Sequence, residues 1–174
     1  MPFRLSLVMG GERDMTDPLE EMYQAYKDPV FRYLRNMCHS RTIAEELTHD
    51  TFIKAFKGFS RFRGESSLKT WLFKIARNTY LNEVNKFSKK NEITYAEPEL
   101  QSGGTIRNIE TEMMVRQTFQ KLTEQEKTLL VLREQGFSLS EMGDILGQSE
   151  GSIKVGIHRA KKKFKKYYLE GEGE

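Results

Sequence analysis

Two stretches of the sequence carry side chains that could bind a nucleic acid. The first combines aromatic rings with basic and amide groups: Trp71, Phe73, Lys74, Arg77, Asn78, Tyr80, Asn82, Asn85, Lys86 and Phe87. Aromatic rings stack on unpaired bases, amide groups read base edges, and cations follow the phosphate backbone. The array therefore predicts a surface for single-stranded nucleic acid. For Trp71 and Phe73 taken alone, burial in a hydrophobic core is the alternative.

The second stretch ends in a basic run and has the pattern of a helix-turn-helix. Ser138 and Glu141 have capping-box spacing, and Gly147 stands where a left-handed turn needs glycine. Gly143 is the small residue that lets the two helices cross closely, and Ser149 can cap the second helix. A lone lysine run is usually a solvated helix end, but this order of elements predicts contact with a DNA major groove. The side chains available to DNA are Lys154, His158, Arg159, Lys161 and Lys162.

We expect no catalytic centre, metal site or cofactor. His39, His49, His158 and Asp50 are scattered along the chain, and no cysteine, histidine and carboxylate set has the spacing of metal ligands. Cys38 is the only cysteine, so no disulfide can form within the chain, which favours a cytoplasmic location. No stretch approaches the roughly 18 apolar residues of a membrane span.

The elements that position these side chains are predicted to be helices, so the expected fold class is all-α. Of the 174 residues, 37% are hydrophobic and 30% charged, which is enough apolar surface to offset the entropy of folding. Aspartate before proline predicts helix starts at Pro18 and Pro29, and a capping box at Thr42 predicts the helix over 44–59. Further helices are expected over 68–90, 109–122 and, after a capping box at Thr123, 129–135. The single strand candidate is 92–95.

Helical spacing also predicts which side chains face the interior. In the helix over 44–59, the expected apolar face comprises Ile43, Leu47, Phe52, Ile53 and Phe56. In the helix over 68–90, it comprises Leu68, Leu72, Ile75, Ala76, Tyr80 and Val84. The latter helix therefore has one apolar face and one face rich in basic and amide groups.

The helices are expected to form two small domains joined by a flexible linker. Residues 1–15 precede the first cap signal and are interpreted as a loose leader. Residues 16–90 would form the first domain and 109–170 the second. The linker, 91–108, holds a proline, a glycine pair and acidic residues, and shows no helical or strand period.

Both domains resemble a known family. Residues 44–86, from AEELTHDTF to NEVNK, resemble region two of the extracytoplasmic-function (ECF) sigma factors of the sigma-70 family. Residues 122–166, from LTEQEK to KKFKK, resemble their region four. The resemblance covers nearly everything from Thr16 to Tyr168. It implies a non-catalytic, dissociable subunit of bacterial RNA polymerase that directs the core enzyme to promoters and supports transcription initiation.

The resemblance implies a role for each region. In region two, one helix would dock on the clamp of the largest polymerase subunit through Glu45, Glu46, Leu47, Asp50, Phe52 and Lys54. For Glu46, a solvated acidic face is the alternative. The same region would hold the melted minus-ten strand, with a flipped base in the loop 62–67, through Phe62, Arg63, Ser67, Trp71, Lys74, Arg77, Asn78, Asn82 and Lys86. Region four would read the minus-thirty-five duplex through Ser149, Gly151, Ser152, Lys154, His158, Arg159, Lys161 and Lys162.

The sequence departs from the family at two places. Family members commonly carry aspartate and arginine where this chain has Asn82 and Asn85, and a serine-arginine pair where it has Val155 and Gly156. Loss of that arginine removes a possible DNA contact, so we expect duplex reading to depend on the remaining basic residues of the helix. A nonstandard or weakly read upstream element is the resulting hypothesis.

The family also implies partners, and a rival interpretation remains. The expected partners are core RNA polymerase, promoter DNA in single-stranded and duplex form, and an inhibitory anti-sigma protein, which in the family is often membrane-bound. The alternative is a stand-alone helix-turn-helix regulator that binds duplex operators without polymerase. A nuclease, the third class considered, would need a catalytic constellation that the sequence does not offer.

Overall fold

The structure, a computed structural model, describes residues 17–90 and 106–171. Within those ranges the chain forms seven α-helices, one short 3-10 helix and no strand. The helices are α1 (Pro18–Cys38), α2 (Arg41–Gly58), η1 (Phe59–Arg61), α3 (Leu68–Lys90), α4 (Ile106–Gln120), α5 (Glu124–Glu134), α6 (Leu139–Leu146) and α7 (Glu150–Gly171). The all-α prediction is confirmed. The leader, most of the linker and the strand candidate 92–95 lie outside the described residues.

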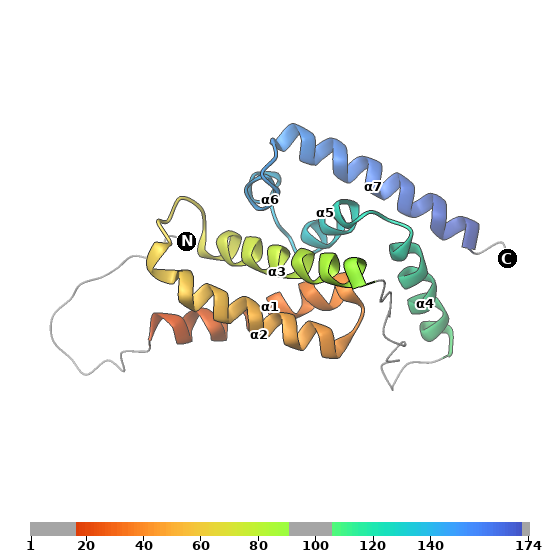
Figure 1. Ribbon diagram of the computed structural model, residues 1–174. Helices are drawn as coiled ribbons and strands as arrows, with labels where there is room; N and C mark the ends of the chain where they lie inside the picture. Colours follow the sequence, from red (N-terminus) through yellow and green to blue (C-terminus); the bar gives the residue numbers. More distant parts are fainter. Residues whose placement is uncertain (1–16, 91–105, 172–174) are drawn as a thin grey trace, which may run out of the picture.

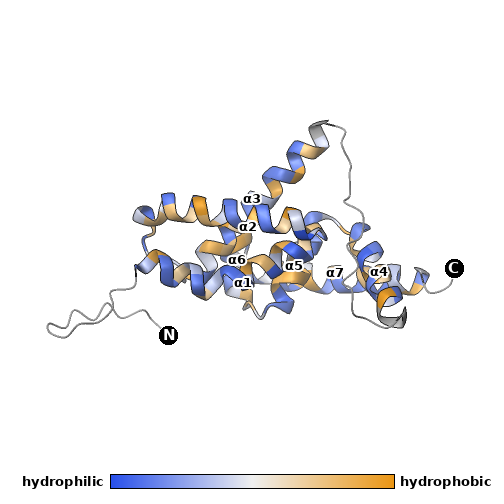
Figure 2. Ribbon diagram, turned by 90° about the horizontal axis from the view of Figure 1, so that it is seen from below, coloured by the Kyte–Doolittle hydropathy of each residue, from blue (hydrophilic) through white to orange (hydrophobic). Residues whose placement is uncertain are grey.

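Helices α1, α2 and α3 form a three-helix bundle (Figure 1). Helix α6 packs on α3 and α5 packs on α1, while α7 lies over α5 and α6 and also contacts α4. Figure 2 shows apolar and polar residues alternating around the helices, which is the pattern of amphipathic helices packed on an interior. Helix α3 begins and ends at the predicted residues, whereas α4 begins at Ile106, inside the predicted linker.

The prediction of a helix start at Pro29 is wrong, because α1 runs through this residue without interruption. A proline inside a helix removes one backbone hydrogen bond and costs about 3 kcal/mol. Burial of one large apolar side chain contributes about 1.5–3 kcal/mol, and Val30, Leu34 and Met37 are all buried on the continuing face. Their packing offsets the cost. The start at Pro18 is confirmed, with Asp17 Oδ1 accepting a hydrogen bond from the Leu19 N–H at 3.1 Å.

The N-cap of α2 is Ser40, not Thr42. The Ser40 backbone is extended, and its hydroxyl accepts a hydrogen bond from the Ile43 N–H at 3.4 Å. The residue is also buried, at 6% exposure, so the helix begins where the chain leaves the interior. Thr42 then lies exposed in the first turn.

The helix-turn-helix formed by α6 and α7 follows the predicted pattern. Thr123 with Glu126 and Ser138 with Glu141 make complete capping boxes at the starts of α5 and α6. Gly147 ends α6 in the left-handed conformation, with φ at 67°. A Cβ added at Gly143 would lie 2.6 Å from the Gln148 carbonyl oxygen, so only glycine lets the turn approach α6 this closely.

The two groups of helices share one hydrophobic interior. Helix α3 packs on α6, and α1 packs on α5. Phe73 of α3 and Phe137, between α5 and α6, are both fully buried, with ring centroids 4.7 Å apart. Tyr80 of α3 donates a hydrogen bond to Glu124 Oε2 at 2.5 Å. The two predicted domains are therefore present but packed against each other.

The first stability prediction concerns Gly143. We expect Gly143→Ala to lower the free energy of unfolding by about 1–3 kcal/mol, because the new methyl group meets a backbone oxygen that cannot move away easily. Gly151→Ala is the matched control, since it is exposed in α7 and its nearest neighbour to an added Cβ is 4.0 Å away. There we expect no loss, or a gain of up to about 1 kcal/mol. Urea unfolding measures both, and equal effects would contradict the close-approach argument.

The second prediction concerns the pH dependence of stability. His39 ends α1 with φ at 55°, and its ring contacts Phe119 of α4 at 5.8 Å between centroids. Burial, followed by the nearby charges of Arg116, Lys127 and Arg35, lowers its pKa from 6.5 to about 4. The unfolded chain therefore binds a proton between these values that the folded chain does not. The stability contribution is full above about pH 6.5 and is lost as the pH falls towards 4.

From pH 7.5 to pH 5 this linkage predicts a loss of about 2 kcal/mol for the wild-type chain. His39→Asn removes the titrating group, and asparagine tolerates a positive φ. We expect the variant to lose less stability than the wild type over the same pH interval in urea unfolding. Equal losses of stability in the two proteins would show that titratable groups other than His39 cause the pH dependence.

Candidate nucleic-acid interface

A pocket of about 430 Å³ lies between the loop before α3 and the first turns of α3. Its lining residues are Arg61, Phe62, Arg63, Glu65, Ser66, Thr70, Trp71, Lys74 and Asp144. The Phe62 and Trp71 rings lie 5.1 Å apart, and Phe59 contacts both. Arg61, Arg63 and Lys74 are exposed around them. The pocket thus combines aromatic faces, which can stack on a base, with cations that can contact phosphates.

The loop is held by local hydrogen bonds at the start of α3. The Ser67 hydroxyl accepts from the Thr70 N–H at 3.0 Å and donates to Thr70 Oγ1 at 2.8 Å. The Trp71 N–H bonds to the Ser67 carbonyl. Gly64 supplies the turn, with φ at 71°. Ser67 therefore caps the start of α3, which begins at Leu68, and its hydroxyl is engaged in that cap.

Along α3 the predicted array divides between the surface and the interior. Lys74, Asn78, Asn82 and Lys86 are exposed and four residues apart, so they lie along one face as an outer stripe that starts at the pocket. Phe73 and Tyr80 are buried, which confirms the core interpretation for Phe73. Trp71 is half-buried and lines the pocket.

Arg77 does not belong to the outer stripe. It is half-buried, and its Nε is enclosed without a hydrogen-bond partner in the described part of the chain. It also lies close enough to Tyr33 to act on that phenol's charge, although burial is what chiefly raises the pKa of Tyr33. The predicted strand-binding residues are therefore brought together except for Arg77, which faces the interior.

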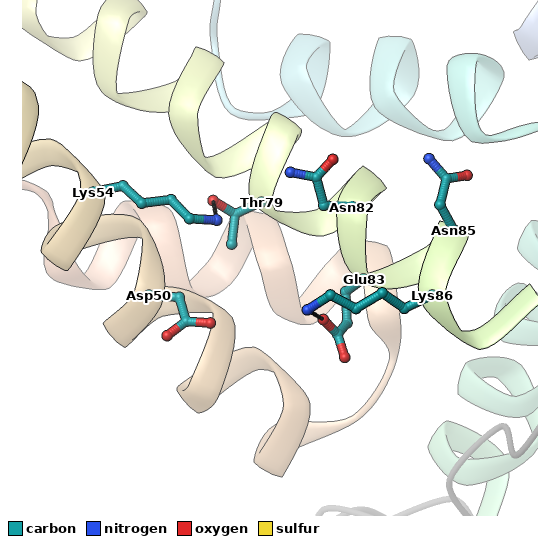
Figure 3. Close-up of a pocket in the computed structure, with 7 residues that line it drawn as sticks. All are labelled: Asp50, Lys54, Thr79, Asn82, Glu83, Asn85 and Lys86. Carbon is teal, nitrogen blue, oxygen red and sulfur yellow. Dashed lines mark hydrogen bonds and ion pairs between the residues drawn. The ribbon is translucent and has the colours of Figure 1, made fainter. Parts of the chain in front are cut away.

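A second pocket, of about 390 Å³, lies between α2 and α3 and is shown in Figure 3. Lys54 Nζ donates to Thr79 Oγ1 at 3.1 Å across the two helices, and Lys86 pairs with Glu83 at 3.0 Å. The lining residues are Asp50, Lys54, Thr79, Asn82, Glu83, Asn85 and Lys86. In Figure 3, Asn82 and Asn85 project from the same side of α3, while Glu83 and Lys86 lie towards α2. The pocket joins predicted polymerase-binding residues to predicted strand-binding residues.

Helix α2 presents a mixed acidic and apolar surface. Glu45, Glu46, Asp50 and Lys54 are exposed, and Glu45 pairs with Arg41 at 2.9 Å. Leu47 and Phe52, which were predicted to contact polymerase, are 3% and 2% exposed. They are part of the interior and support α2 from behind.

The expected inner face of α2 is also corrected at two positions. Ile53 and Phe56 are 36% and 37% exposed, as is Tyr23 of α1 at 37%. Tyr23 packs edge-on against Phe52 at 4.9 Å, so the surface formed by α1 and α2 carries exposed apolar side chains as well as acids. The sequence contained a signal of this exposure, because apolar residues occur on more sides of α2 than one hydrophobic interior can bury.

The eight predicted duplex-reading residues are all exposed, seven in α7 and Ser149 directly before it: Ser149, Gly151, Ser152, Lys154, His158, Arg159, Lys161 and Lys162. Ile153, Ile157 and Ala160 are buried on the opposite side. The Ser149 hydroxyl caps the helix by accepting from the Ser152 N–H at 3.2 Å. The residues chosen from the sequence therefore share the outward face of one helix.

Gly156 has a different orientation from these residues. A Cβ added there would lie 2.8 Å from Leu129 Cδ1 of α5, so this position faces the interior. An arginine at 156 would have to displace a buried leucine before it could reach DNA. Val155, in contrast, is 48% exposed. The glycine thus serves the packing of α7 on α5.

The described ranges contain neither a metal-binding cluster nor a membrane-spanning helix. Residues 17–90 and 106–171 contain no cluster of three histidine, cysteine or carboxylate side chains that could hold a metal ion. A search of the same residues found no helix of the length and apolarity that crossing a membrane requires.

Comparison with known proteins gives the same two regions in the same order. A family model described as Sigma-70 region 2 matches residues 22–89, and one described as Sigma-70, region 4 matches residues 112–164. The chain is 35% identical over 162 residues to RNA polymerase sigma factor YlaC of Bacillus subtilis, covering 86% of this chain and 91% of that protein. It is 31% identical over 137 residues to the ECF RNA polymerase sigma-E factor of Haemophilus influenzae, covering 70% and 72%.

The fold is also found among solved structures. The sigma factor RpoE of Bartonella quintana, in complex with the anti-sigma factor NepR, superposes with a TM-score of 0.69 at 21% identity over 85% of this chain and 94% of that chain. CnrH, in complex with the cytosolic domain of CnrY, gives a TM-score of 0.64 at 20% identity, with 84% of each chain covered.

A relative with 35% identity over nearly its whole length, both regions in order and the shared helical fold lead to one conclusion. This chain belongs to the extracytoplasmic-function sigma factors of bacterial RNA polymerase.

Proposed function

We propose that this sigma factor docks on core RNA polymerase through α2, captures the minus-ten strand at the pocket beside Trp71, and contacts the minus-thirty-five duplex with the outward face of α7. The observation that carries the proposal is the continuity of the strand site. The aromatic pocket opens onto the outer stripe of α3, so one flipped base and the nucleotides next to it would meet a single surface.

The chemistry of the strand site fits an unpaired base. Extracting a base from the duplex costs a few kcal/mol, and stacking on an aromatic side chain returns about 1–3 kcal/mol. Phe62 and Trp71 offer such faces, and the amides of Asn78 and Asn82 can read base edges. The exposed cations would follow the backbone. Arg77, which faces the interior, would support α3 rather than touch the strand.

The polymerase-docking surface would combine the exposed acids of α2 with nearby apolar side chains. Glu45, Glu46 and Asp50 supply charge, and Ile53 with Phe56 supplies apolar area that water would leave on binding. Buried Leu47 and Phe52 would keep that surface rigid. The chain would have no catalytic role of its own and would act in the cytoplasm, where the core enzyme works.

An inhibitory protein is part of the same proposal. Two solved proteins with this fold are in complexes: the sigma factor RpoE with the anti-sigma factor NepR, and CnrH with the cytosolic domain of CnrY. Their identity to this chain is 21% and 20%, so the support is limited to a shared fold. We propose that an anti-sigma protein, carried by a membrane protein or free, binds the exposed surfaces of this chain.

In vitro transcription tests the proposal. The purified chain with core polymerase is expected to initiate at a defined set of sites on a genomic library, whereas neither component alone does so. Sequencing of the transcript starts then gives the promoter pattern. A stand-alone regulator would instead protect specific duplex sites without polymerase, and that result would overturn the proposal.

The strand site gives the third prediction. Lys74→Ala with Asn82→Ala is expected to reduce promoter opening roughly tenfold or more, because a cation and a base-reading amide are lost from the outer stripe. Permanganate reactivity of unpaired thymines measures the opening. Arg32→Ala with Asn36→Ala is the control, since it removes one exposed cation and one exposed amide from α1, outside the outer stripe. If both double variants open promoters equally well, the outer stripe does not bind the strand.

The duplex site gives the fourth prediction. Replacing Lys154, His158 and Arg159 by alanine is expected to redistribute transcript starts on the genomic library and to weaken the salt dependence of promoter binding, because base and phosphate contacts are lost together. Arg159→Lys separates base contacts from phosphate contacts, because lysine keeps the positive charge but cannot form the two parallel hydrogen bonds of a guanidinium group. An unchanged set of start sites in the triple variant would exclude α7 from promoter selection.

A further inference from the structure

We propose that Glu126 limits how strongly α7 grips the phosphates of duplex DNA, because its carboxylate holds Lys163 at the edge of the outward face. This role rests on the proposed function of α7 as the duplex-binding helix. It concerns two residues outside the predicted duplex-reading set. It also divides the basic run of α7 into lysines that contact DNA and one lysine that is kept from it.

The ion pair between Glu126 and Lys163 joins two helices. Lys163 Nζ of α7 lies 3.0 Å from Oε2 and 3.2 Å from Oε1 of Glu126 in α5. The other ion pairs in which both partners are described join side chains three or four positions apart within one helix. The Lys163 and Glu126 side chains are 33% and 22% exposed, so water and salt screen their attraction less than that of fully exposed pairs. Lys163 is therefore held by α5 and is not free in solvent.

The Glu126 carboxylate is fixed in place by a second set of hydrogen bonds. It closes the capping box of α5, where its Oε2 accepts from the Thr123 N–H at 2.8 Å and its own N–H donates to the Thr123 hydroxyl at 3.3 Å. An acceptor that is already ordered loses little further freedom when the lysine binds it. Burial acts to raise the pKa of Glu126, but the hydrogen bonds from Thr123 and Lys163 hold it below its usual value. The carboxylate thus stays charged.

Lys163 lies where a released side chain would reach DNA. It follows Arg159 by four residues, so the two occupy adjacent turns along one edge of the outward face of α7. Arg159, Lys161 and Lys162 are exposed, whereas Lys163 is half-buried. Lysine has a flexible four-carbon stem. Without the carboxylate, its ammonium group would turn towards the phosphates that flank a helix in the major groove.

Holding this lysine back favours sequence-specific binding over general binding. Phosphate contacts position a protein on the duplex but carry no sequence information. Each additional one strengthens binding to every duplex, whether or not it contains a promoter. Glu126 would therefore keep the affinity for unrelated DNA low, while Lys154, His158 and Arg159 stay free to read bases.

The salt dependence of duplex binding tests this role on the full chain. The logarithm of the binding constant falls with the logarithm of the salt concentration, by about 0.9 for each phosphate contact. We expect Glu126→Gln to steepen this slope by about 0.9 on a double-stranded oligonucleotide of random sequence, because the released Lys163 gains one phosphate. Glutamine also closes a capping box, so the start of α5 is kept.

Glu141→Gln is the matched control. Glu141 closes the capping box of α6 with Ser138 through hydrogen bonds of 2.8 and 3.2 Å, and it belongs to none of the ion pairs between described residues. Its replacement changes the net charge equally and should leave the slope unchanged. Glu126→Gln combined with Lys163→Gln should return the slope to the wild-type value, and Lys163→Gln alone should not alter it.

Four results would overturn the inference: an unchanged slope in Glu126→Gln, an equal steepening in Glu141→Gln, a double variant that stays steep, or a shallower slope in Lys163→Gln alone. The last would mean that Lys163 already contacts phosphates beside Glu126. If Lys161→Gln with Lys162→Gln leaves the wild-type slope unaltered, α7 does not bind the duplex, and the proposed function of this helix has failed instead.

Discussion

The position of Phe73 is the constraint on which the arrangement of the whole chain depends. Its ring lies against Tyr33 of α1 at 5.5 Å and against Phe137 at 4.7 Å, and all three side chains are fully buried. Each such aromatic pair contributes about 0.5–1.5 kcal/mol beyond the burial of its area. One residue of α3 therefore links the three-helix bundle to the helix-turn-helix. The side chains of α3 that are proposed to bind DNA lie on the sides that this packing leaves exposed.

Helix α3 thus packs against both groups of helices, and its inner and outer faces have different roles. The inner face, with Leu72, Phe73, Ala76 and Tyr80, is buried between both groups of helices. The outer stripe continues from a pocket whose loop is fixed by the cap at Ser67. Because the inner face is rigid, the exposed side chains keep their spacing without needing contacts to one another. A binding surface built this way needs little ordering when its ligand arrives, which favours affinity.

Local signals in the sequence were sufficient to predict the parts of the fold that depend on residues close together along the chain. The capping boxes at Thr123 and Ser138, the turn at Gly147 and the close approach at Gly143 all follow from backbone geometry within a few residues. The outward set on α7 also followed, since buried and exposed residues alternate with the helical period. The exposure of these residues could be predicted because one regular helix carries them, and their contact with DNA stays a prediction.

Features set by contacts between distant residues could not be predicted in this way. Burial of the face after Pro29 outweighs the missing hydrogen bond, and Ser40 caps α2 because it lies at the edge of the interior. The exposure of Ile53 and Phe56 depends on how much of α2 the neighbouring helices cover. Asp144 reaches the strand pocket only through the packing of α6 on α3. Periodicity identifies an apolar face but does not say which partner covers it.

The glycine that lets α7 lie close on α5 limits how this protein can diverge. Position 156 points at Leu129, so a longer side chain there has to shift that leucine side chain. Outward positions such as Lys154 and His158 have no such neighbour to displace and can be exchanged singly. Single replacements on the outer face of α7 therefore leave the interior undisturbed, whereas a replacement at position 156 also changes how α7 packs on α5.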